Sequence, residues 1–486
     1  MKINKFLLPF LIGLVGIFSF APFSIKFLIF VSYGYLINVL LNSRDNTFWK
    51  IFCWGIGHWG FGMSWLIVSV YYYGETTLAL STAIYILLVC ILTIVFTCPI
   101  FFIKSASEWL KINNKIHKVL FISALLSISE LSRYYLLNGV PWLIPGSIFL
   151  DTYTQNIYPL LGVSALSFLI YLICTSIVVS NNNKALFFLL PIVVLTLIPE
   201  EKSVITEDGL LVSIVQPASD PFLKYKGDYY SQIEKNLHSL IDITSEDSKL
   251  IVIPEAELPY LLDNQRFDDF LRKTTKSEKI IMGSWEYQDN SLYNSIYSPK
   301  YDESYKKTHL VPFGEYIPFI DGLRGLIGFF DLPMSNVSHG SRNQQNIRLL
   351  NDIKVATPIC FDIAFPNTVR LMNKSSLLMI NISNDTWFGN SIGPYHHLDI
   401  SRIRSIENNR WTIRATNDGI SALISNYGTI VDYLDKGEST ILEGTVNLID
   451  EVSFFNQIGY LLTYIFLFII VISTILWSIW KNFAKN

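Results

Sequence analysis

Long stretches without a charged residue most constrain how this chain of 486 residues can fold. Residues 1–200 hold 17 charged side chains, residues 201–456 hold 58, and residues 457–486 hold 2. A helix needs about 20 mostly apolar residues to cross a bilayer, and the first and last parts of the chain contain such stretches. We therefore expect a membrane domain at 1–200, a soluble domain at 207–450 and a C-terminal span at 452–480.

Uncharged windows bounded by ionic residues predict the individual spans. The window at 134–150 contains Asn138-Gly139-Val140-Pro141, so we expect a loop at the membrane surface there, after a weaker span. Seven spans before residue 200 and one after residue 452 are predicted, in the windows 6–25, 27–43, 51–74, 76–103, about 118–137, 152–183, 185–199 and 452–480.

Lysines and arginines in the short loops predict the orientation, because they collect on the cytoplasmic side. With a cytoplasmic N-terminus, nine of them face the cytoplasm and only Lys26 and Arg133 face outward. Seven crossings then place the soluble domain outside the cytoplasm. The small residues in Phe18-Ser19-Phe20-Ala21-Pro22 resemble a signal cleavage site, but we expect the first span to be retained, because cleavage would leave an even number of crossings.

Glu130 and Arg133 lie three residues apart near the outer end of the weaker span. Two interpretations are open: a solvated pair at a helix end, or the polar lining of a substrate entrance. We favour the solvated pair.

The soluble domain alternates short apolar runs with polar helical segments. Ile233, Leu237, Leu240 and Ile241 recur at helical spacing, as one side of an amphipathic helix does. This succession predicts an α/β sandwich. The expected buried strands are 211–215, 250–253, 279–282, 354–356 and 377–382.

One cysteine, Cys360, lies in the soluble domain, whereas Cys53, Cys90, Cys98 and Cys174 lie in predicted spans. Without a partner in its own domain, Cys360 is not half of an intradomain disulfide. It is either an inert core thiol or a reactive thiol at the carboxyl end of a strand, where open α/β sheets place their chemistry. Taken alone, the cysteine leaves both interpretations open.

Polar groups near Cys360 in the expected fold favour a reactive thiol. Glu255 follows the strand at 250–253, and Lys307 and Glu315 lie in an irregular segment. A thiol needs a base to become a thiolate, and its acyl adduct needs positive charge beside the developing oxyanion. Glutamate, lysine and cysteine supply these three functions.

The order Glu255, Lys307, Cys360 resembles the Glu-Lys-Cys triad of the nitrilase superfamily. The resemblance extends over nearly the whole chain and implies a multispanning α-helical membrane protein of about eight spans that carries an α/β nitrilase-like αββα sandwich. The strings that are similar to bacterial apolipoprotein N-acyltransferases are Phe20-Ala21-Pro22, Gly139-Val140-Pro141-Trp142, the segment from Lys307 to Pro318, Ser383-Asn384-Asp385-Thr386-Trp387-Phe388-Gly389 and Arg414-Ala415-Thr416-Asn417-Asp418-Gly419-Ile420-Ser421.

This resemblance implies a two-step acyl transfer at the bacterial inner membrane, with the catalytic domain on the periplasmic side. Cys360 attacks the sn-1 ester of a phospholipid, typically phosphatidylethanolamine, and the resulting thioester passes its acyl chain to the α-amine of a diacylglyceryl-modified N-terminal cysteine. Glu255 is the general base, Lys307 and the backbone N–H after Cys360 stabilise the oxyanion, and Glu315 orients the lysine or the base. No cofactor is expected, and no block is basic enough to predict nucleic acid binding.

The chain departs from the family pattern directly after its cysteine, where Phe361-Asp362 replaces Tyr-Glu. Asp362 keeps the charge on a shorter side chain, and Phe361 keeps the ring without its hydroxyl. Because the triad is intact, we expect an active enzyme.

The segment at 387–397 contains two glycines, Gly389 and Gly393, and aromatic residues that we expect to be exposed beside the membrane surface. Its Trp387 belongs either to a lid that contacts the acyl chain or to the domain core, and the family resemblance favours the lid. Tyr225 matches a position of the family where an aromatic residue flanks the site.

His396 and His397 have no further ligands at metal-binding spacing, so we expect no metal. One cluster of charged residues is expected to form a salt-bridged helical face and not a phosphate site: Arg402, Arg404, Glu407, Arg410 and Arg414.

Two other functions are open. A membrane-tethered amidase would use the same triad, but a small soluble substrate does not require eight spans. A catalytically silent scaffold or transporter would explain the spans but leaves the complete triad unexplained.

Overall fold

The computed structural model describes residues 5–73, 77–180, 197–199, 203–221, 223–312, 314–316, 337–349 and 352–483. The chain separates into two compact units. Unit 1 comprises Met1–Leu66, Ala79–Glu201 and Ile458–Asn486, and unit 2 comprises Ile67–Leu78 and Lys202–Gln457.

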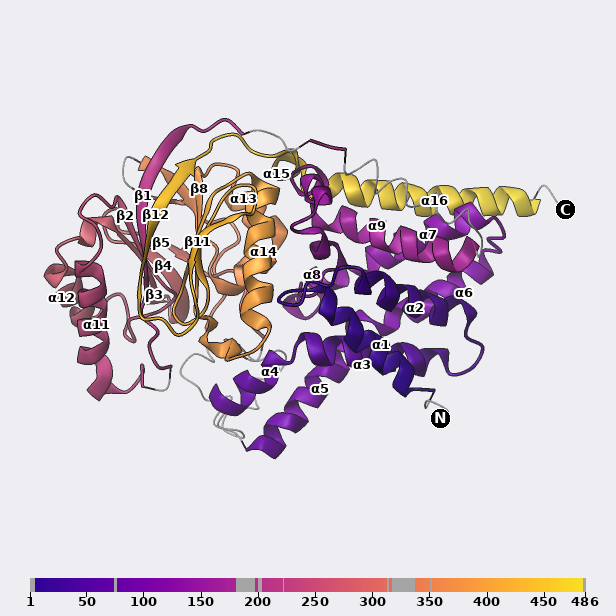
Figure 1. The fold of residues 1–486 in the computed structure, drawn as a ribbon, viewed down its shortest axis with the longest axis horizontal. Helices are drawn as coiled ribbons and strands as arrows, with labels where there is room; N and C mark the ends of the chain where they lie inside the picture. Colours follow the sequence, from indigo (N-terminus) through magenta and orange to yellow (C-terminus); the bar gives the residue numbers. More distant parts are fainter. Residues whose placement is uncertain are drawn as a thin grey trace. The chain divides into compact units, whose positions relative to one another are not determined.

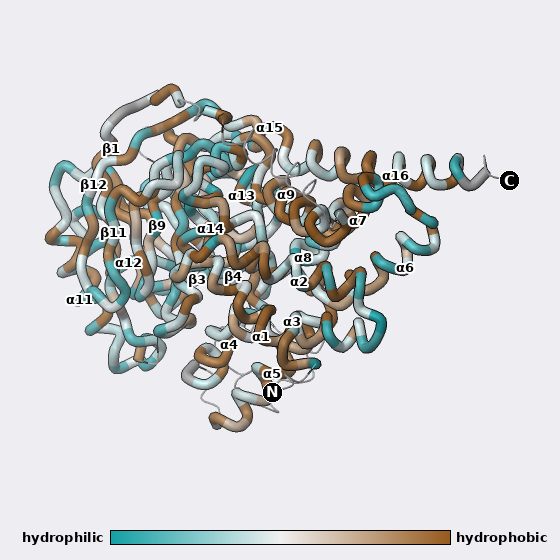
Figure 2. The backbone as a smooth tube through the Cα atoms, turned by 45° about the vertical axis from the view of Figure 1, so that its right-hand side comes forward, coloured by the Kyte–Doolittle hydropathy of each residue, from teal (hydrophilic) through white to brown (hydrophobic). Residues whose placement is uncertain are grey.

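Unit 1 is helical. Its helices are α1 (Leu7–Val15), α2 (Leu28–Asn42), α3 (Thr47–Gly62), α4 (Trp65–Val68, which extends into unit 2), α5 (Leu78–Phe96), α6 (Phe101–Trp109), α7 (Lys115–Ser129), α8 (Ser132–Tyr135), α9 (Tyr158–Ser180) and α16 (Leu461–Phe483). Apolar residues predominate along many of these helices, whereas hydrophilic residues are frequent around α11 of unit 2 (Figure 2).

Among the described residues, four helical stretches are long and apolar enough to cross a membrane, or five if a bent pair counts as one span. The shorter apolar helices Leu7–Ser19 and Leu28–Asn42 fall in the first two predicted windows. Most of the predicted span at 185–199 lies outside the described residues. The count of about eight therefore stays a prediction. The four stretches are Leu78–Trp109, Lys115–Asn138, Tyr153–Ser180 and Leu461–Lys481, and the bent pair is Thr47–Gly62 with Trp65–Tyr71.

Small residues let helices of unit 1 approach closely. A Cβ on Gly13 of α1 would lie 2.1 Å from the Trp54 carbonyl oxygen of α3, and a Cβ on Gly57 would lie 2.0 Å from that of Phe10. Helix α16 instead presents exposed apolar side chains along its length, including Phe466 and Ile469. Close glycine contacts and apolar outer surfaces are typical of membrane helices.

The prediction of a solvated Glu130–Arg133 pair is wrong, because both side chains are buried. The Tyr171 hydroxyl donates a hydrogen bond of 2.7 Å to Glu130 Oε1, and Arg133 Nη1 donates one of 2.9 Å to the Leu143 carbonyl. Arg133 therefore ties the irregular segment after α8 to the helices. Buried charges in a membrane domain need such partners.

The described residues of unit 2 form two six-stranded sheets, ordered β12-β1-β2-β3-β4-β5 and β11-β10-β9-β8-β7-β6. Figure 1 shows α11 and α12 on one side of the strands and α13 and α14 on the other. The elements are β1 (Glu207–Gln216), α11 (Tyr230–Asp242), β2 (Leu250–Ile253), α12 (Gln265–Lys273), β3 (Ile280–Gln288), β4 (Ser291–Ser298), β5 (Glu303–Lys306), β6 (Ile347–Arg348), β7 (Lys354–Ala356), α13 (Pro366–Met372), β8 (Leu378–Ser383), α14 (Gly393–Asn408), β9 (Thr412–Thr416), β10 (Ser421–Ile424), β11 (Ile430–Leu434), β12 (Thr440–Leu448) and α15 (Phe454–Ile458).

Successive side chains along each strand point to opposite faces of its sheet, so unit 2 has one core between the two sheets and others between the sheets and the helices. Val252 of β2 and Ile380 of β8 belong to the core between the sheets, whereas Ile251 packs with α11 and α12, and Met379 packs with Val369 of α13. Strands covered on both faces are apolar throughout. The five expected strands consequently match strands of the structure.

The expected helical face from Arg402 to Arg414 is only partly correct. Helix α14 ends at Asn408, and the next residue, Asn409, is its left-handed cap with a φ of 55°. Arg410 follows the helix, and Arg414 lies in β9; both are fully buried. A left-handed residue stops the helix, so the helical spacing does not continue across it.

Candidate active site

The three predicted catalytic residues follow strands that run in the same direction within their sheets. Glu255 lies two residues after β2, and Lys307 directly follows β5. β5 is parallel to β2, because two antiparallel pairings separate it from β3, which pairs with β2 in parallel. Cys360 follows β7, which is parallel to β8 in the second sheet. Carboxyl ends of parallel strands share one edge of a sheet, and side chains there can converge.

Lys307 lies between two carboxylates. Its Nζ is 3.0 Å from Glu255 Oε1 and 2.8 Å from Glu315 Oε1, and all three side chains are at least nine-tenths buried. Burial alone would lower the pKa of Lys307, but the charges of Glu255 and Glu315 raise it well above its ordinary value. Lys307 is therefore a permanent cation, suited to stabilise negative charge and unsuited to act as a base.

Asn294 of β4 holds both carboxylates in place. Its Nδ2 donates to Glu255 Oε1 at 2.6 Å and to Glu315 Oε1 at 3.1 Å. The other oxygen of Glu255 accepts the backbone N–H of Asn384 at 2.7 Å, which links the two sheets at this point. Sequence reasoning missed Asn294, because an asparagine in a polar strand carries no motif.

Cys360 has an unusual backbone and a protonated thiol. Its φ is +44°, a left-handed conformation that is uncommon outside glycine. Burial, with a smaller contribution from Glu255, raises the pKa of the thiol, and Lys307 opposes the increase. The thiol is therefore neutral at rest, and a base must remove its proton during attack.

Asp362 joins the segment after Lys307 to the turn at Cys360. Its Oδ1 accepts the His309 N–H at 2.7 Å, and its Oδ2 accepts the Tyr305 hydroxyl at 3.1 Å and the Thr308 N–H at 3.4 Å. The side chain is fully buried. The predicted supporting residue thus contacts the backbone on both sides of the candidate site.

Known families match most of the chain. The model of the apolipoprotein N-acyltransferase N-terminal domain matches residues 12–176, and that of carbon-nitrogen hydrolase matches residues 211–453. The apolipoprotein N-acyltransferase of Shewanella oneidensis is 31% identical, covering 94% of this chain and 92% of its own. The Pseudomonas syringae pv. tomato relative is 30% identical (88% of each chain), and the Pasteurella multocida relative is 29% identical (88% and 87%).

The chain belongs to the apolipoprotein N-acyltransferase family. This membership and the apolar helices make it a membrane protein and an acyltransferase of the nitrilase superfamily. The comparisons do not concern individual side chains, so the catalytic roles of Glu255, Lys307 and Cys360 stay predictions.

This acyltransferase keeps Phe361 in contact with other rings. Phe361 is buried and packs edge-to-face on Phe365 at 5.3 Å between ring centroids, and Phe365 stacks on His309 at 3.6 Å. The aromatic ring therefore helps to join the two segments that Asp362 also bridges, without a hydroxyl group.

The predicted substrate residues Tyr225 and Trp387 pack against one small cluster of buried residues, which includes Ala256 and Trp285. Trp387 is partly buried, and its carbonyl accepts a hydrogen bond of 2.8 Å from Ser69 Oγ of the segment 67–73, also in unit 2. Phe388 is buried, so the segment is less exposed than expected. Motion of a lid stays a prediction.

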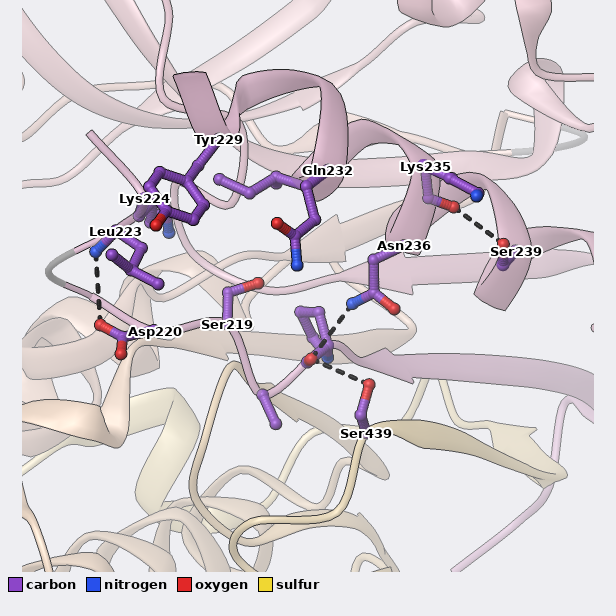
Figure 3. A pocket seen from close by; sticks show the side chains of 13 residues that line it. Ser219, Asp220, Leu223, Lys224, Tyr229, Gln232, Lys235, Asn236, Ser239 and Ser439 are labelled. Atoms are coloured by element: carbon purple, nitrogen blue, oxygen red, sulfur yellow. Dashed lines mark hydrogen bonds between the residues drawn. The ribbon is translucent and has the colours of Figure 1, made fainter. Parts of the chain in front are cut away.

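A surface pocket of about 490 Å³ lies between the β1–α11 connection and α11 (Figure 3). Ser219, Asp220 and Lys224 line it, together with residues of α11 such as Gln232 and Asn236. None of the three predicted catalytic residues lines this pocket. We do not assign the acyl-transfer chemistry to it.

Replacing Gly283 by alanine should disturb Glu255 in this acyltransferase. A Cβ at Gly283 of β3 would lie 2.4 Å from Ala256 N and 2.5 Å from Glu255 Cα. Both are backbone atoms, so relieving the overlap requires the chain around Glu255 to shift. We expect the free energy of unfolding to fall by about 1–3 kcal/mol and activity to drop with it. Thermal unfolding and acyl transfer measure the two effects. Gly227→Ala is the control, because nothing lies within 4 Å of its Cβ; equal effects of the two substitutions would contradict the prediction.

Asp362 should make stability depend on pH near neutrality. Burial raises the pKa of Asp362 to about 7, although Lys307 and backbone N–H groups oppose the shift. The folded state therefore holds a proton that the unfolded state releases, and the stability from this group is present below about pH 4 and is lost as pH rises to about 7. We expect the advantage of wild type over Asp362→Asn in thermal unfolding to shrink across this window. Parallel pH profiles would contradict this.

Proposed function

We propose that this chain transfers the sn-1 acyl chain of a phospholipid to the N-terminal diacylglyceryl-cysteine of apolipoproteins, through a thioester on Cys360. The observation that carries the proposal is the buried Lys307 cation between Glu255 and Glu315, together with a neutral cysteine thiol on which the charges of Lys307 and Glu255 act. This arrangement supplies a nucleophile, a base and a positive charge.

In the first step, Cys360 Sγ attacks the ester carbonyl carbon while its proton passes to Glu255. The carbonyl oxygen becomes an oxyanion, which Lys307 and the backbone N–H of Phe361 stabilise. When this intermediate collapses, the C–O bond to the glycerol breaks, and the proton on Glu255 moves to the departing oxygen. The products are a lysophospholipid and the Cys360 thioester.

In the second step, the α-amine of the apolipoprotein cysteine attacks the thioester carbonyl. Glu255 accepts the amine proton, the same donors stabilise the second oxyanion, and the C–S bond breaks. The sulfur leaves as a thiolate and recovers the proton from Glu255. The product is an amide-linked third acyl chain, and the enzyme returns to its starting state.

We place this chemistry on the periplasmic side of the bacterial inner membrane. The domains in this proposal are a seven-span region at 1–200, the catalytic domain at 207–450 and the last of about eight spans at 452–480. The excess of lysine and arginine in the loops that are then cytoplasmic supports this orientation. A membrane-impermeant thiol reagent should block activity in spheroplasts, and no effect would contradict the orientation.

The test uses the full-length protein in detergent with phosphatidylethanolamine labelled on its sn-1 chain. We expect the label to appear on Cys360 in a hydroxylamine-sensitive form and to move to a diacylated lipopeptide when one is added. Label that never enters the protein, together with hydrolysis of a small amide, would contradict the proposal and favour the amidase function.

A further inference from the structure

The turn that carries Cys360 requires a contact to hold it. Cys360 has a φ of +44° and begins the 3₁₀ turn Cys360–Ala364. Left-handed backbone in a residue other than glycine is strained and persists only where its surroundings enforce it. The carbonyl group of Cys360 is in contact with one such neighbour, the imidazole of His397.

His397 of α14 reaches this carbonyl from the interior of unit 2. Its Nε2 is 3.2 Å from the Cys360 carbonyl oxygen, and its Nδ1 is 3.0 Å from Asp385 Oδ1. Arg414 lies in β9, and its Nη2 is 2.6 Å from Asp385 Oδ2 and 3.1 Å from His397 Nδ1. All three side chains are almost fully buried. Three separate elements therefore fix the position of the imidazole.

The contacts determine the protonation state of His397. Burial and the charge of Arg414 lower its pKa, against the opposing effect of Asp385, so the ring is neutral at pH 7. A neutral ring has one hydrogen, and both the Cys360 carbonyl at Nε2 and the Asp385 carboxylate at Nδ1 can only accept. Asp385 Oδ1 already accepts the Ser383 hydroxyl at 2.6 Å, and Arg414 Nη2, which can only donate, lies 3.1 Å from Nδ1. We therefore assign the hydrogen to Nε2. Nδ1 then carries a lone pair, which accepts from Arg414. Asp385 remains ionised, because the charge of Arg414 holds the pKa of Asp385 well below its ordinary value against the effect of burial.

Fixing the carbonyl of Cys360 also fixes the direction of the next N–H. The peptide between Cys360 and Phe361 is planar, and in a trans peptide the C=O and N–H point in opposite directions. Phe361 lies in the first turn of the 3₁₀ segment, where N–H groups have no acceptor within the helix. This N–H is the oxyanion donor in the proposed function.

We propose that His397 is a positioning residue, which holds the Cys360–Phe361 peptide so that the Phe361 N–H faces the oxyanion. The inference rests on the proposed function, since it concerns the oxyanion of the thioester-forming step. Arg414 acts through His397 by donating to Nδ1, which fixes the tautomer and the ring orientation, and Asp385 holds Arg414 in place.

A matched pair of substitutions tests this hydrogen bond. His397→Gln places an amide N–H near the position of Nε2, whereas His397→Met has a similar length and no donor. We expect His397→Met to lower the kcat of thioester formation about tenfold or more, with KM unchanged, because oxyanion donors contribute to kcat. His397→Gln should recover most of this loss. His397→Asn should not, because its amide reaches only the position of Nδ1.

A second reaction separates positioning from general damage. Alkylation of Cys360 by iodoacetamide forms no oxyanion, so His397→Met should be alkylated at nearly the wild-type rate. His396→Met on the same helix controls for the loss of a buried imidazole. Equal acylation rates in the Gln and Met variants, or an equal loss of acylation, alkylation and thermal stability, would overturn the proposal. If the proposed function itself is wrong, the wild-type protein will form no thioester, and this result is distinct from the outcomes above.

Discussion

Replacing Cys360 by serine should lower acyl transfer by about 10³-fold or more, because loss of a nucleophile removes the covalent route. A serine hydroxyl is a much weaker acid than a thiol, so a neighbouring carboxylate removes its proton far less readily. The thiol of Cys360 already needs the help of a base, since burial and the charge of Glu255 raise its pKa. Transfer of labelled acyl chain from phospholipid to lipopeptide measures the loss.

The fold should tolerate this substitution, because serine and cysteine have similar shapes. We expect the thermal unfolding temperature of Cys360→Ser to stay close to that of wild type. Cys53→Ser, in α3 of unit 1, is the matched control and should retain activity. Undiminished transfer by Cys360→Ser would contradict a thioester mechanism and favour the silent scaffold.

Replacing Lys307 by methionine should reduce both activity and stability. The two buried carboxylates of Glu255 and Glu315 would lose the cation between them. Breaking a buried ion pair on one side costs about 3–5 kcal/mol, and a lost oxyanion donor costs about 10²- to 10³-fold in kcat. Thermal unfolding and single-turnover formation of the thioester measure the two losses separately.

Two variants separate these effects of Lys307. Lys306→Met removes the neighbouring lysine, which pairs with the partly exposed Glu286, and should change stability by less than about 1 kcal/mol. Lys307→Met combined with Glu315→Gln removes one buried negative charge, so stability should partly recover while activity does not. Recovery of activity in this double variant would show that Lys307 only stabilises the fold.

The strands that sequence patterns predicted well are those covered on both faces. β2 is fully buried and begins and ends at the predicted residues. β4 and β11 were missed, because their half-exposed strands mix polar and apolar side chains. A strand of this kind gives no clear periodic signal, although pairing with its neighbours stabilises it equally well. β9 and β10 were missed although they are fully buried, because β9 (Thr412–Thr416) contains Arg414 and β10 (Ser421–Ile424) has only four residues.

Local patterns also failed where a partner is distant in the chain. The charges of Glu130 and Arg133 suggested exposure, yet the structure supplies Tyr171 and the Leu143 carbonyl as buried partners. Arg414 was assigned to a helical face from its spacing alone, but the turn at Asn409 places it in β9 against Asp385. Neither result could be predicted without knowing which segments pack together.

The sequence by itself determined the division into apolar and charged regions, the main strands and the order Glu255, Lys307, Cys360. These features depend only on residues that are close together in the chain. Only the tertiary structure decided that Asn294 joins the two carboxylates, that Asp362 bridges both segments of the site, and that His397 contacts the Cys360 carbonyl. The physical reason is that buried hydrogen bonds join residues far apart in the chain, and the packing of the sheets determines which donors meet which acceptors.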